Sequence, residues 1–519
     1  MSFAGNRLSA VMWLTSVLML AMLQSCAMPA APAISASALP SADIFVQANR
    51  ITWGATPSTV ERLQAKGINA YLASQLLPDT AAVLPAEVQA QIDGMTITQR
   101  PLLDLVQDME QRRKDADAIT DDDAKKAAQQ TYQAEMNRLA REAAKRHLLR
   151  ALYSPQQVQE EMTWFWLNHF NVHQGKSNLR AMVGDYENVA IRPHALGKFR
   201  DLLGAVVHHP AMLCYLDNEQ NALGHINENF ARELMELHTL GVDGGYTQHD
   251  VQELARVLTG VGINLGSTTP GQRKELQAYY VRRGLFEFNP ARHDFGDKVL
   301  LGGPIRGRGL DELEAALDRL ARSPATARFI SKKLATYWLS DEPSRPLLQA
   351  MAKTFERSDG DIASTLRVLF TSPEFSNAAQ QKFKDPMRFV LSAVRLAYDG
   401  KPVLNVGPML NWINRMGEPL YGHVTPDGYA LQSAAWTSSG QLSTRFEVAK
   451  AIGSGSAGLF RTEGPQPQER PAFPQLANAL YYQSIIKTLG PATRQALDQA
   501  VSPQEWNAFL LSSPEMMRR

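Results

Sequence analysis

The chain has 519 residues, of which 44% are hydrophobic and 20% are charged, so it has ample material for a folded core and lacks the composition of a disordered chain. Its 53 Lys and Arg residues nearly balance 52 Asp and Glu residues, which leaves a formal net charge of +1. A nucleic-acid-binding protein is expected to carry a strongly basic surface. The composition therefore argues against nucleic acid as a partner.

The first 26 residues have the pattern of an export signal. Arg7 lies in a short polar start, an apolar run follows over 10–22, and the run ends in Leu23-Gln24-Ser25-Cys26. This run is too short to span a bilayer, and its end resembles the lipobox of bacterial lipoproteins, in which the cysteine thiol takes the lipid. We expect an exported protein of the periplasm or outer membrane, attached to the membrane only by a lipid on Cys26. The alternative is ordinary cleavage nearby, after the small-residue stretch 28–33.

The rest of the chain predicts a tether followed by a helical body. Residues 27–42 are rich in Ala, Pro and Ser, as in a flexible tether. Over 43–519 we expect one large, mainly α-helical domain, with a flexible excursion rich in Gly, Ser and Pro at 453–475. Helix starts are indicated at Thr56-Pro57, Thr120 with Asp123, Ser154-Pro155, Asn227, and Thr247 with Asp250.

Two further segments complete the expected fold. Residues 278–303 contain short aromatic and β-branched runs separated by polar turns, which predicts a small β ribbon. A helical pattern returns over 310–397, with loops around 341–343 and 359–361. The predicted fold class is therefore mainly α, with a small β ribbon.

Motifs spread over nearly the whole mature chain include Trp166–Phe170, His209–Asp217, Asn227–Gly241 and Pro426–Tyr429. These motifs resemble the large bacterial family known as domain of unknown function 1800. The resemblance implies an exported protein, often encoded beside a second exported family, and it implies no established activity. Two positions depart from the family pattern: Val261 stands where a tryptophan is expected, and Leu167 stands where a polar residue or histidine is common. The long string Asn227–Gly241 is the specific one.

The helix expected from Asn227 to about Leu240 places two carboxylates together. Helical residues turn by about 100° each, so Glu233 and Glu236 share one flank at the edge of the core, and His238 lies on the other side. Two carboxylates one turn apart suit a metal site or an acid/base pair, because their repulsion raises one pKa unless a cation intervenes. The alternative is an ion-pair network in which Arg232 supplies that cation.

Two histidines extend the candidate site. His169 lies on the apolar face of the helix that follows Ser154-Pro155, where it is either a core histidine or part of a pocket wall. His293 and Asp294 lie in a turn of the β ribbon, from which side chains can reach a cleft. The alternative for Asp294 is that it caps its own turn.

Together these residues predict an exported hydrolase or oxidoreductase that acts on an envelope or extracellular compound. Its catalytic residues would be Glu233, Glu236, His169, His293 and Asp294. They would either act as acid and base or, with the exception of Asp294, bind a divalent metal ion. Haem is disfavoured, because the chain has no CxxCH attachment motif. The competing prediction is a lipid-anchored binding or assembly protein that serves a co-exported partner through an exposed aromatic face, formed by Trp412, Tyr421, Tyr429 and Trp436.

Overall fold

The structure is a computed structural model that describes residues 41–77, 83–266, 270–306, 308–377, 382–461, 473–478 and 485–519. The expected signal segment 1–26 with Cys26, nearly all of the tether, and residues 462–472 of the expected excursion lie outside these residues. Residues Pro40–Arg519 form one compact unit. The fold of this unit is mainly α-helical with small antiparallel sheets, as predicted.

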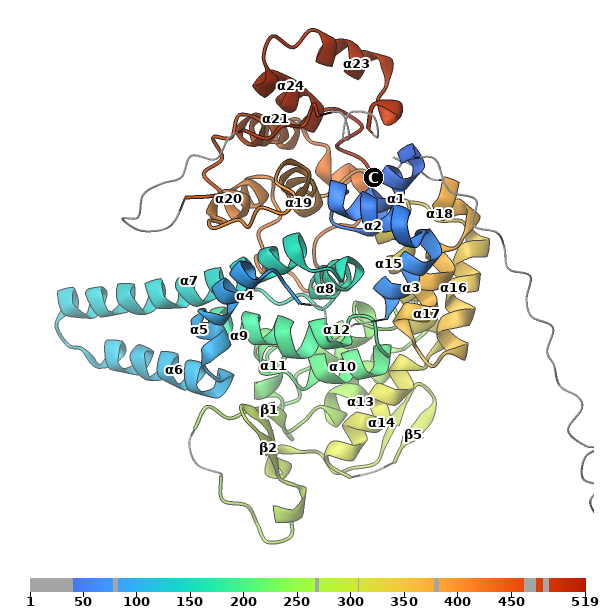
Figure 1. The fold of residues 1–519 in the computed structure, drawn as a ribbon. Coiled ribbons are helices and arrows are strands. Elements are labelled where there is room, and N and C mark those ends of the chain that lie inside the picture. The colour runs from blue at the N-terminus through green and yellow to red at the C-terminus, as the bar shows by residue number, and fades with distance from the viewer. Residues whose placement is uncertain are drawn as a thin grey trace, which may run out of the picture. The chain divides into compact units, whose positions relative to one another are not determined.

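The N-terminal part of the unit ends in a long helical hairpin, in which α6 and α7 lie side by side (Figure 1). The prediction that Thr56 caps a helix is confirmed, because its side chain accepts a hydrogen bond from the Thr59 N–H. The expected cap at Thr120 is wrong by one residue: Asp121 accepts from the Ala124 N–H instead. The helices of this part are α1 (Ser41–Ile51), α2 (Pro57–Lys66), α3 (Ile68–Leu76), α4 (Ala86–Asp93), α5 (Thr96–Gln99), α6 (Leu102–Ala118) and α7 (Asp122–Tyr153).

Helix α8 is the central element of the next part. It was expected to bury one face, but every residue of Gln157–His169 is buried, because α3, α7 and η1 pack around it. The elements that follow are α9 (Leu179–Asp185), the π-helix η1 (Tyr186–Ile191), η2 (Arg192–His194), α10 (Phe199–Val207), α11 (Pro210–Tyr215), η3 (Asn218–Gln220), α12 (Asn229–Glu236) and α13 (Gln248–Val257).

Helix α12 is shorter than predicted. It ends at Glu236 instead of continuing to about Leu240, because the next residues form wider turns in which His238 N–H donates to the Glu233 carbonyl and Leu240 N–H to that of Met235. Gly241 still ends the segment, with a φ of +82°. The wider turns direct His238 into the core, where it is fully buried.

The short strands lie where the β ribbon was predicted, with one addition. Strands β2 (Val281–Arg283) and β3 (Phe286–Phe288) pair antiparallel, and β4 (Lys298–Leu300) pairs with β5 (Gly303–Ile305). The unpredicted strand β1 (Val261–Ile263) pairs with β3, with Val261 opposite Phe288. Three residues directly after a helix are too few to show the alternation that predicts a strand. Two short helices, η4 (Gln277–Tyr279) and η5 (Pro290–Arg292), flank β2 and β3.

The C-terminal part is helical, as predicted for 310–397. Helices α15, α16 and α17 pack on one another, and α21 packs on α19 and α24. None of the helices in the described ranges is long and apolar enough to cross a membrane. The elements are α14 (Leu310–Ala321), α15 (Pro324–Trp338), α16 (Arg345–Arg357), α17 (Ile362–Phe370), α18 (Pro373–Asn377), α19 (Pro386–Ala397), α20 (Gly407–Arg415), η6 (Ser433–Trp436), α21 (Ser439–Gly453), η7 (Ile486–Thr488), α23 (Pro491–Asp498) and α24 (Pro503–Leu511).

The expected aromatic face of Trp412, Tyr421, Tyr429 and Trp436 is not on the surface. Trp412, Tyr421 and Trp436 are 8%, 5% and 6% exposed, and Tyr429 stacks on Trp164 of α8. The segment folds back onto α8, so these aromatic rings belong to the core and do not form an exposed face for a partner.

Candidate functional site

Two buried histidines lie at the C-terminal end of α8. His169 is 1% exposed, and its Nε2 lies 3.0 Å from the backbone carbonyl oxygen of His238. Because a carbonyl only accepts hydrogen bonds, Nε2 carries the hydrogen and Nδ1 keeps a lone pair. No described residue hydrogen-bonds to that Nδ1 or to either ring nitrogen of His238. Burial lowers the pKa of His238 to about 3 and that of His169 well below its ordinary value, so both rings are neutral.

Lys333 of α15 is a charged neighbour of both histidines, and its charge also lowers their pKa values. Its Nζ lies 5.6 Å from the centre of the Phe329 ring. Within the described ranges, no hydrogen bond or ion pair reaches this amine. Burial lowers the pKa of Lys333 to about 8, although the nearby charge of Asp427 acts in the opposite direction. An amine in this state is partly neutral near physiological pH.

Glu233 of α12 is a half-buried carboxylate without a cationic partner. Burial raises its pKa, and the charges of Glu236 and Asp427 raise it further, while Arg232 acts against them. Glu236 differs: it lies 3.6 Å from Arg232 Nη1 and accepts a hydrogen bond from the Tyr246 hydroxyl. The predicted repulsion between Glu233 and Glu236 and the alternative ion pair with Arg232 are therefore both present, and Glu236 is the carboxylate that pairs with Arg232.

Asp427 lies on a loop that α8 holds in place. The Asn168 side chain donates to the Tyr429 carbonyl at 2.9 Å and accepts from the Tyr429 N–H at 2.6 Å. Gly428, between Asp427 and Tyr429 in the sequence, has a φ of +75°. An added Cβ would clash with the Asn168 carbonyl oxygen, so only glycine fits. Although burial acts to raise the pKa of Asp427, hydrogen bonds from Thr425 and His423 outweigh it and hold the pKa below its ordinary value.

Glu233, Lys333 and Asp427, with His169 and His238, are called the acid–base cluster below. Asp427 is the neighbour that Glu233 and Lys333 share, since its charge affects the pKa of both. The sequence pointed to Glu233 and His169, missed Lys333, and assigned no role to Asp427. A signal for Lys333 was present: it lies three residues after Ile330 and four before Tyr337, which are both buried, although Lys333 itself is only partly buried.

His293 and Asp294 lie in a different environment. His293 Nδ1 is 2.8 Å from the Thr259 carbonyl oxygen, so it donates to that group, and Nε2 is 3.5 Å from Glu312. Asp294 binds Arg256 at 2.8 Å and accepts from the Gly296 N–H, and the Arg256 hydrogen bond lowers its pKa to about 2. The alternative considered for Asp294, a cap of its own turn, is what the structure shows.

The structure does not bring the four predicted metal ligands together. Glu236 faces Arg232 and Tyr246, His169 faces His238, and His293 faces Thr259 and Glu312. Throughout the described part of the chain, no three His, Cys, Asp or Glu side chains are grouped so that they could hold a metal ion. The divalent ion stays a prediction, and we base no chemistry on it.

Comparison with known proteins identifies one family. The model of the family described as "Protein of unknown function (DUF1800)" matches residues 47–518, a span that contains every member of the acid–base cluster. Neither a curated protein nor a solved structure matches the chain. The resemblance seen in the sequence is thus confirmed over nearly the whole chain, which belongs to this family of unknown function, DUF1800.

Proposed function

We propose that this protein is a hydrolase that uses Glu233 and Lys333 as its acid–base pair. One observation carries the proposal: a carboxylate and an amine, neither of them in an ion pair, share Asp427 as a neighbour. Buried charged groups are ordinarily paired, and groups whose pKa values are displaced toward neutrality mark sites of proton transfer. Glu233 has its pKa raised and Lys333 has its pKa lowered, as general acid/base work at neutral pH requires.

The two groups can supply both proton transfers of a hydrolysis. The neutral Lys333 amine takes a proton from a water molecule, whose oxygen attacks the substrate. Glu233 gives its proton to the leaving atom as the scissile bond breaks, and the two groups then exchange protons with solvent. The ionised Asp427 stabilises the ammonium form of Lys333 while the reaction proceeds.

The cellular address belongs to the same proposal. The sequence of 1–26 supports export and a lipid on Cys26, so the substrate would be an envelope or extracellular compound. Cell fractionation tests this part, because Cys26→Ala should move the protein from the membrane fraction to the soluble fraction. Wild-type protein found entirely in the soluble fraction would contradict the anchor.

Competitive acetylation across pH 6–11 tests the electrostatics of the site. The rate of Lys333 labelling should titrate with a midpoint of about 8, and Asp427→Asn should lower that midpoint, because the charge that raises the pKa is removed. The exposed neighbour Lys332 is the internal control. A Lys333 midpoint equal to that of Lys332 would contradict the proposed role.

A panel of fluorogenic esters, amides and glycosides tests the activity. Glu233→Gln and Lys333→Met should each lower hydrolysis by about 100- to 10,000-fold, the usual contribution of a general acid or base. Glu61→Gln and Lys332→Met change exposed residues of the same types and should leave the rate unchanged. Activity that survives in both site variants would overturn the proposal.

A further inference from the structure

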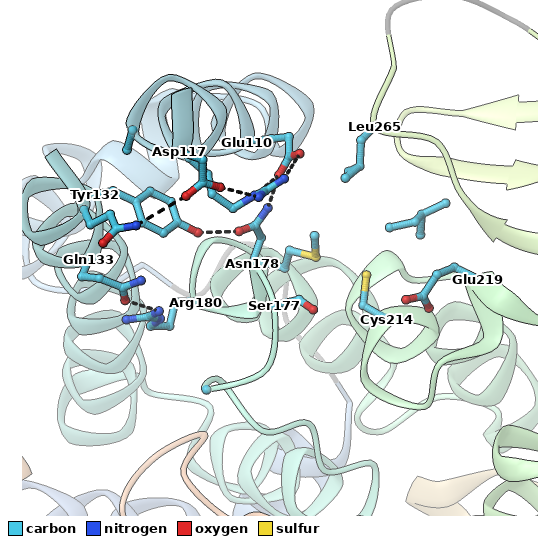
Figure 2. A pocket seen from close by; sticks show the side chains of 16 residues that line it. Glu110, Asp117, Tyr132, Gln133, Ser177, Asn178, Arg180, Cys214, Glu219 and Leu265 are labelled. Carbon is cyan, nitrogen blue, oxygen red and sulfur yellow. Dashed lines mark hydrogen bonds and ion pairs between the residues drawn. The ribbon is translucent and has the colours of Figure 1, made fainter. Parts of the chain in front are cut away.

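A cavity of about 840 Å³ lies between the α6/α7 hairpin and the β1 region (Figure 2). Its volume falls within the range of about 300–1,000 Å³ that is typical of small-molecule sites. The segment before α9 and the end of α11 complete its lining. No member of the acid–base cluster lines it, so the two sites can be tested separately.

One wall of the cavity is polar and is held by its own hydrogen bonds. The Tyr132 hydroxyl donates to Asn178 Oδ1 at 2.7 Å, and Asn178 Nδ2 donates to Glu110 at 3.3 Å. Arg113 binds Glu110 at 2.7 Å and Asp117 at 2.9 Å. Because these side chains fix one another, a ligand would not have to order them on binding.

The opposite wall is apolar except for one carboxylate. It consists of Cys214, Ile263, Leu265 and Glu219, and Figure 2 shows the Glu219 carboxylate across the cavity from Tyr132 and Asn178. Burial raises the pKa of the Cys214 thiol to about 12, so this side chain is an uncharged part of the wall. This wall suits the carbon skeleton of a ligand, with Glu219 as its charged contact.

Glu219 lacks a counter-ion. No described residue hydrogen-bonds to its Oε2, which is buried, and burial raises the pKa of this carboxyl. The two nearby cations are bound elsewhere: Lys176 lies 2.7 Å from Asp217, and Arg292 donates to the backbone carbonyl of Glu219 at 2.7 Å. Glu219 is only partly buried and lines the cavity, so a donor that enters the cavity can reach the accessible part of this carboxylate, which has no cationic partner among the described residues.

We infer that this cavity binds a small ligand that carries a primary ammonium group, with Glu219 as the counter-ion. An ammonium has three N–H donors, and a charge-assisted hydrogen bond to a carboxylate is stronger than a neutral one. Ile263 and Leu265 contact the carbon skeleton, and Asn178 with its network faces amide or hydroxyl groups on the rest of the ligand. A short peptide with a free amino terminus and an amino sugar share this chemistry.

Titration calorimetry on the full chain tests the inference and separates these two sources. The probes are trialanine, glucosamine and the N-acetylated form of each, because acetylation removes the charge and keeps the skeleton. At least one free amine should bind, and its acetylated form should bind at least about tenfold more weakly, the loss expected for one charge-assisted hydrogen bond. Binding of trialanine alone assigns a peptide, and binding of glucosamine alone assigns an amino sugar.

Glu219→Gln should weaken binding of the free amine by the same factor. Glu61 is an exposed glutamate on α2, so the Glu61→Gln control should bind the amine as the wild type does. Glutamine has nearly the same shape, and circular dichroism with a melting curve checks that the variant is folded. The inference is overturned if neither free amine binds, if acetylated probes bind equally well, or if folded Glu219→Gln retains full affinity.

Discussion

The acid–base cluster and the group around His293 are built from the same residue types but differ in pairing. Around His293, the buried Lys298 lies 2.6 Å from Glu312 and also donates to the carbonyls of Asp294 and Gly296. In the cluster, Lys333 and Glu233 have no such partners among the described residues. A histidine beside carboxylates and a lysine is therefore weak evidence of a functional site. The pairing of each charge separates a structural network from a reactive one.

The two groups should also contribute to stability with opposite signs. Removing a paired buried charge leaves its partner without a counter-ion, which destabilises the fold. Removing an unpaired buried charge relieves a desolvation penalty, which stabilises the fold. Active sites commonly carry such destabilising groups because the reaction requires them.

The largest effect is expected for Glu312→Gln, which removes the carboxylate bound to Lys298. Because the Lys298 side chain has no solvent exposure, the stranded ammonium should lower the free energy of unfolding by about 3 to 5 kcal/mol. Urea denaturation at pH 7 measures this change, with Glu61→Gln as the exposed control. A loss under about 1 kcal/mol would show that the network does not stabilise the fold.

Gly428→Ala should disturb the loop that carries Asp427. The left-handed backbone alone destabilises alanine by about 1 to 2 kcal/mol, and its Cβ would also clash with the Asn168 carbonyl oxygen. The displaced loop should move Asp427 away from Lys333, so the labelling midpoint of Lys333 should fall. Gly440→Ala, where an added Cβ meets nothing within 4 Å, is the control. An unchanged midpoint in a destabilised Gly428→Ala protein would contradict the link between loop and lysine.

Lys333→Met should stabilise the protein although it lowers the rate of hydrolysis. The folded-state pKa of about 8 lies below the ordinary 10.5, so the folded state bears the full penalty of the charged amine below about pH 8. As pH rises from 8 to 10.5 the unfolded chain still holds the proton, and wild-type stability recovers. The variant should therefore gain about 1 to 3 kcal/mol at pH 7, and this gain should shrink toward pH 10.5. Denaturation curves across that range, with Lys332→Met as the flat control, measure the effect.

The sequence predicted those parts of the fold that depend on nearby residues. Thr56 and Thr247 mark helix starts because a cap is satisfied within three residues, and both caps are present. The end of α12 was mispredicted because no local signal marks the wider turns after Glu236. In the structure these turns go with a tertiary contact between His238 and His169, which the sequence of the helix does not reveal. Strand β1 was missed because its pairing with β3 is not visible in three residues.

The same limit applies to the candidate site. Glu233 was accessible from the sequence because the flank of one helix is a local property. Asp427, which acts on both Glu233 and Lys333, lies on a loop far along the chain, and the hydrogen bonds of Asn168 that hold this loop are tertiary contacts. His293 was selected because its position in a turn suggested access to a cleft, whereas its partners Thr259 and Glu312 bury it.

The smallest effect, and the sharpest test of the contrast, is expected at Glu233. Its folded-state pKa lies above the ordinary 4.5, so between those two values the folded state holds more protons than the unfolded chain. Wild-type stability should therefore fall as pH rises through this window, and Glu233→Gln should abolish that fall. Because the Glu233 carboxylate is half-buried and partly screened, Glu233→Gln should raise the free energy of unfolding at pH 7 by less than about 1 kcal/mol.

Carbon-13 NMR of the glutamate carboxyls measures the pKa of Glu233 directly, and Glu236→Gln is the matched variant. Removing the Glu236 charge should lower the pKa of Glu233 without restoring its ordinary value, since burial is the larger cause and Asp427 remains. Glu236→Gln itself should lack the stability gain, because Glu236 has Arg232 as a partner. If both variants were destabilised equally, Glu233 would have a partner of its own, and the distinction between reactive and structural carboxylates on α12 would fail.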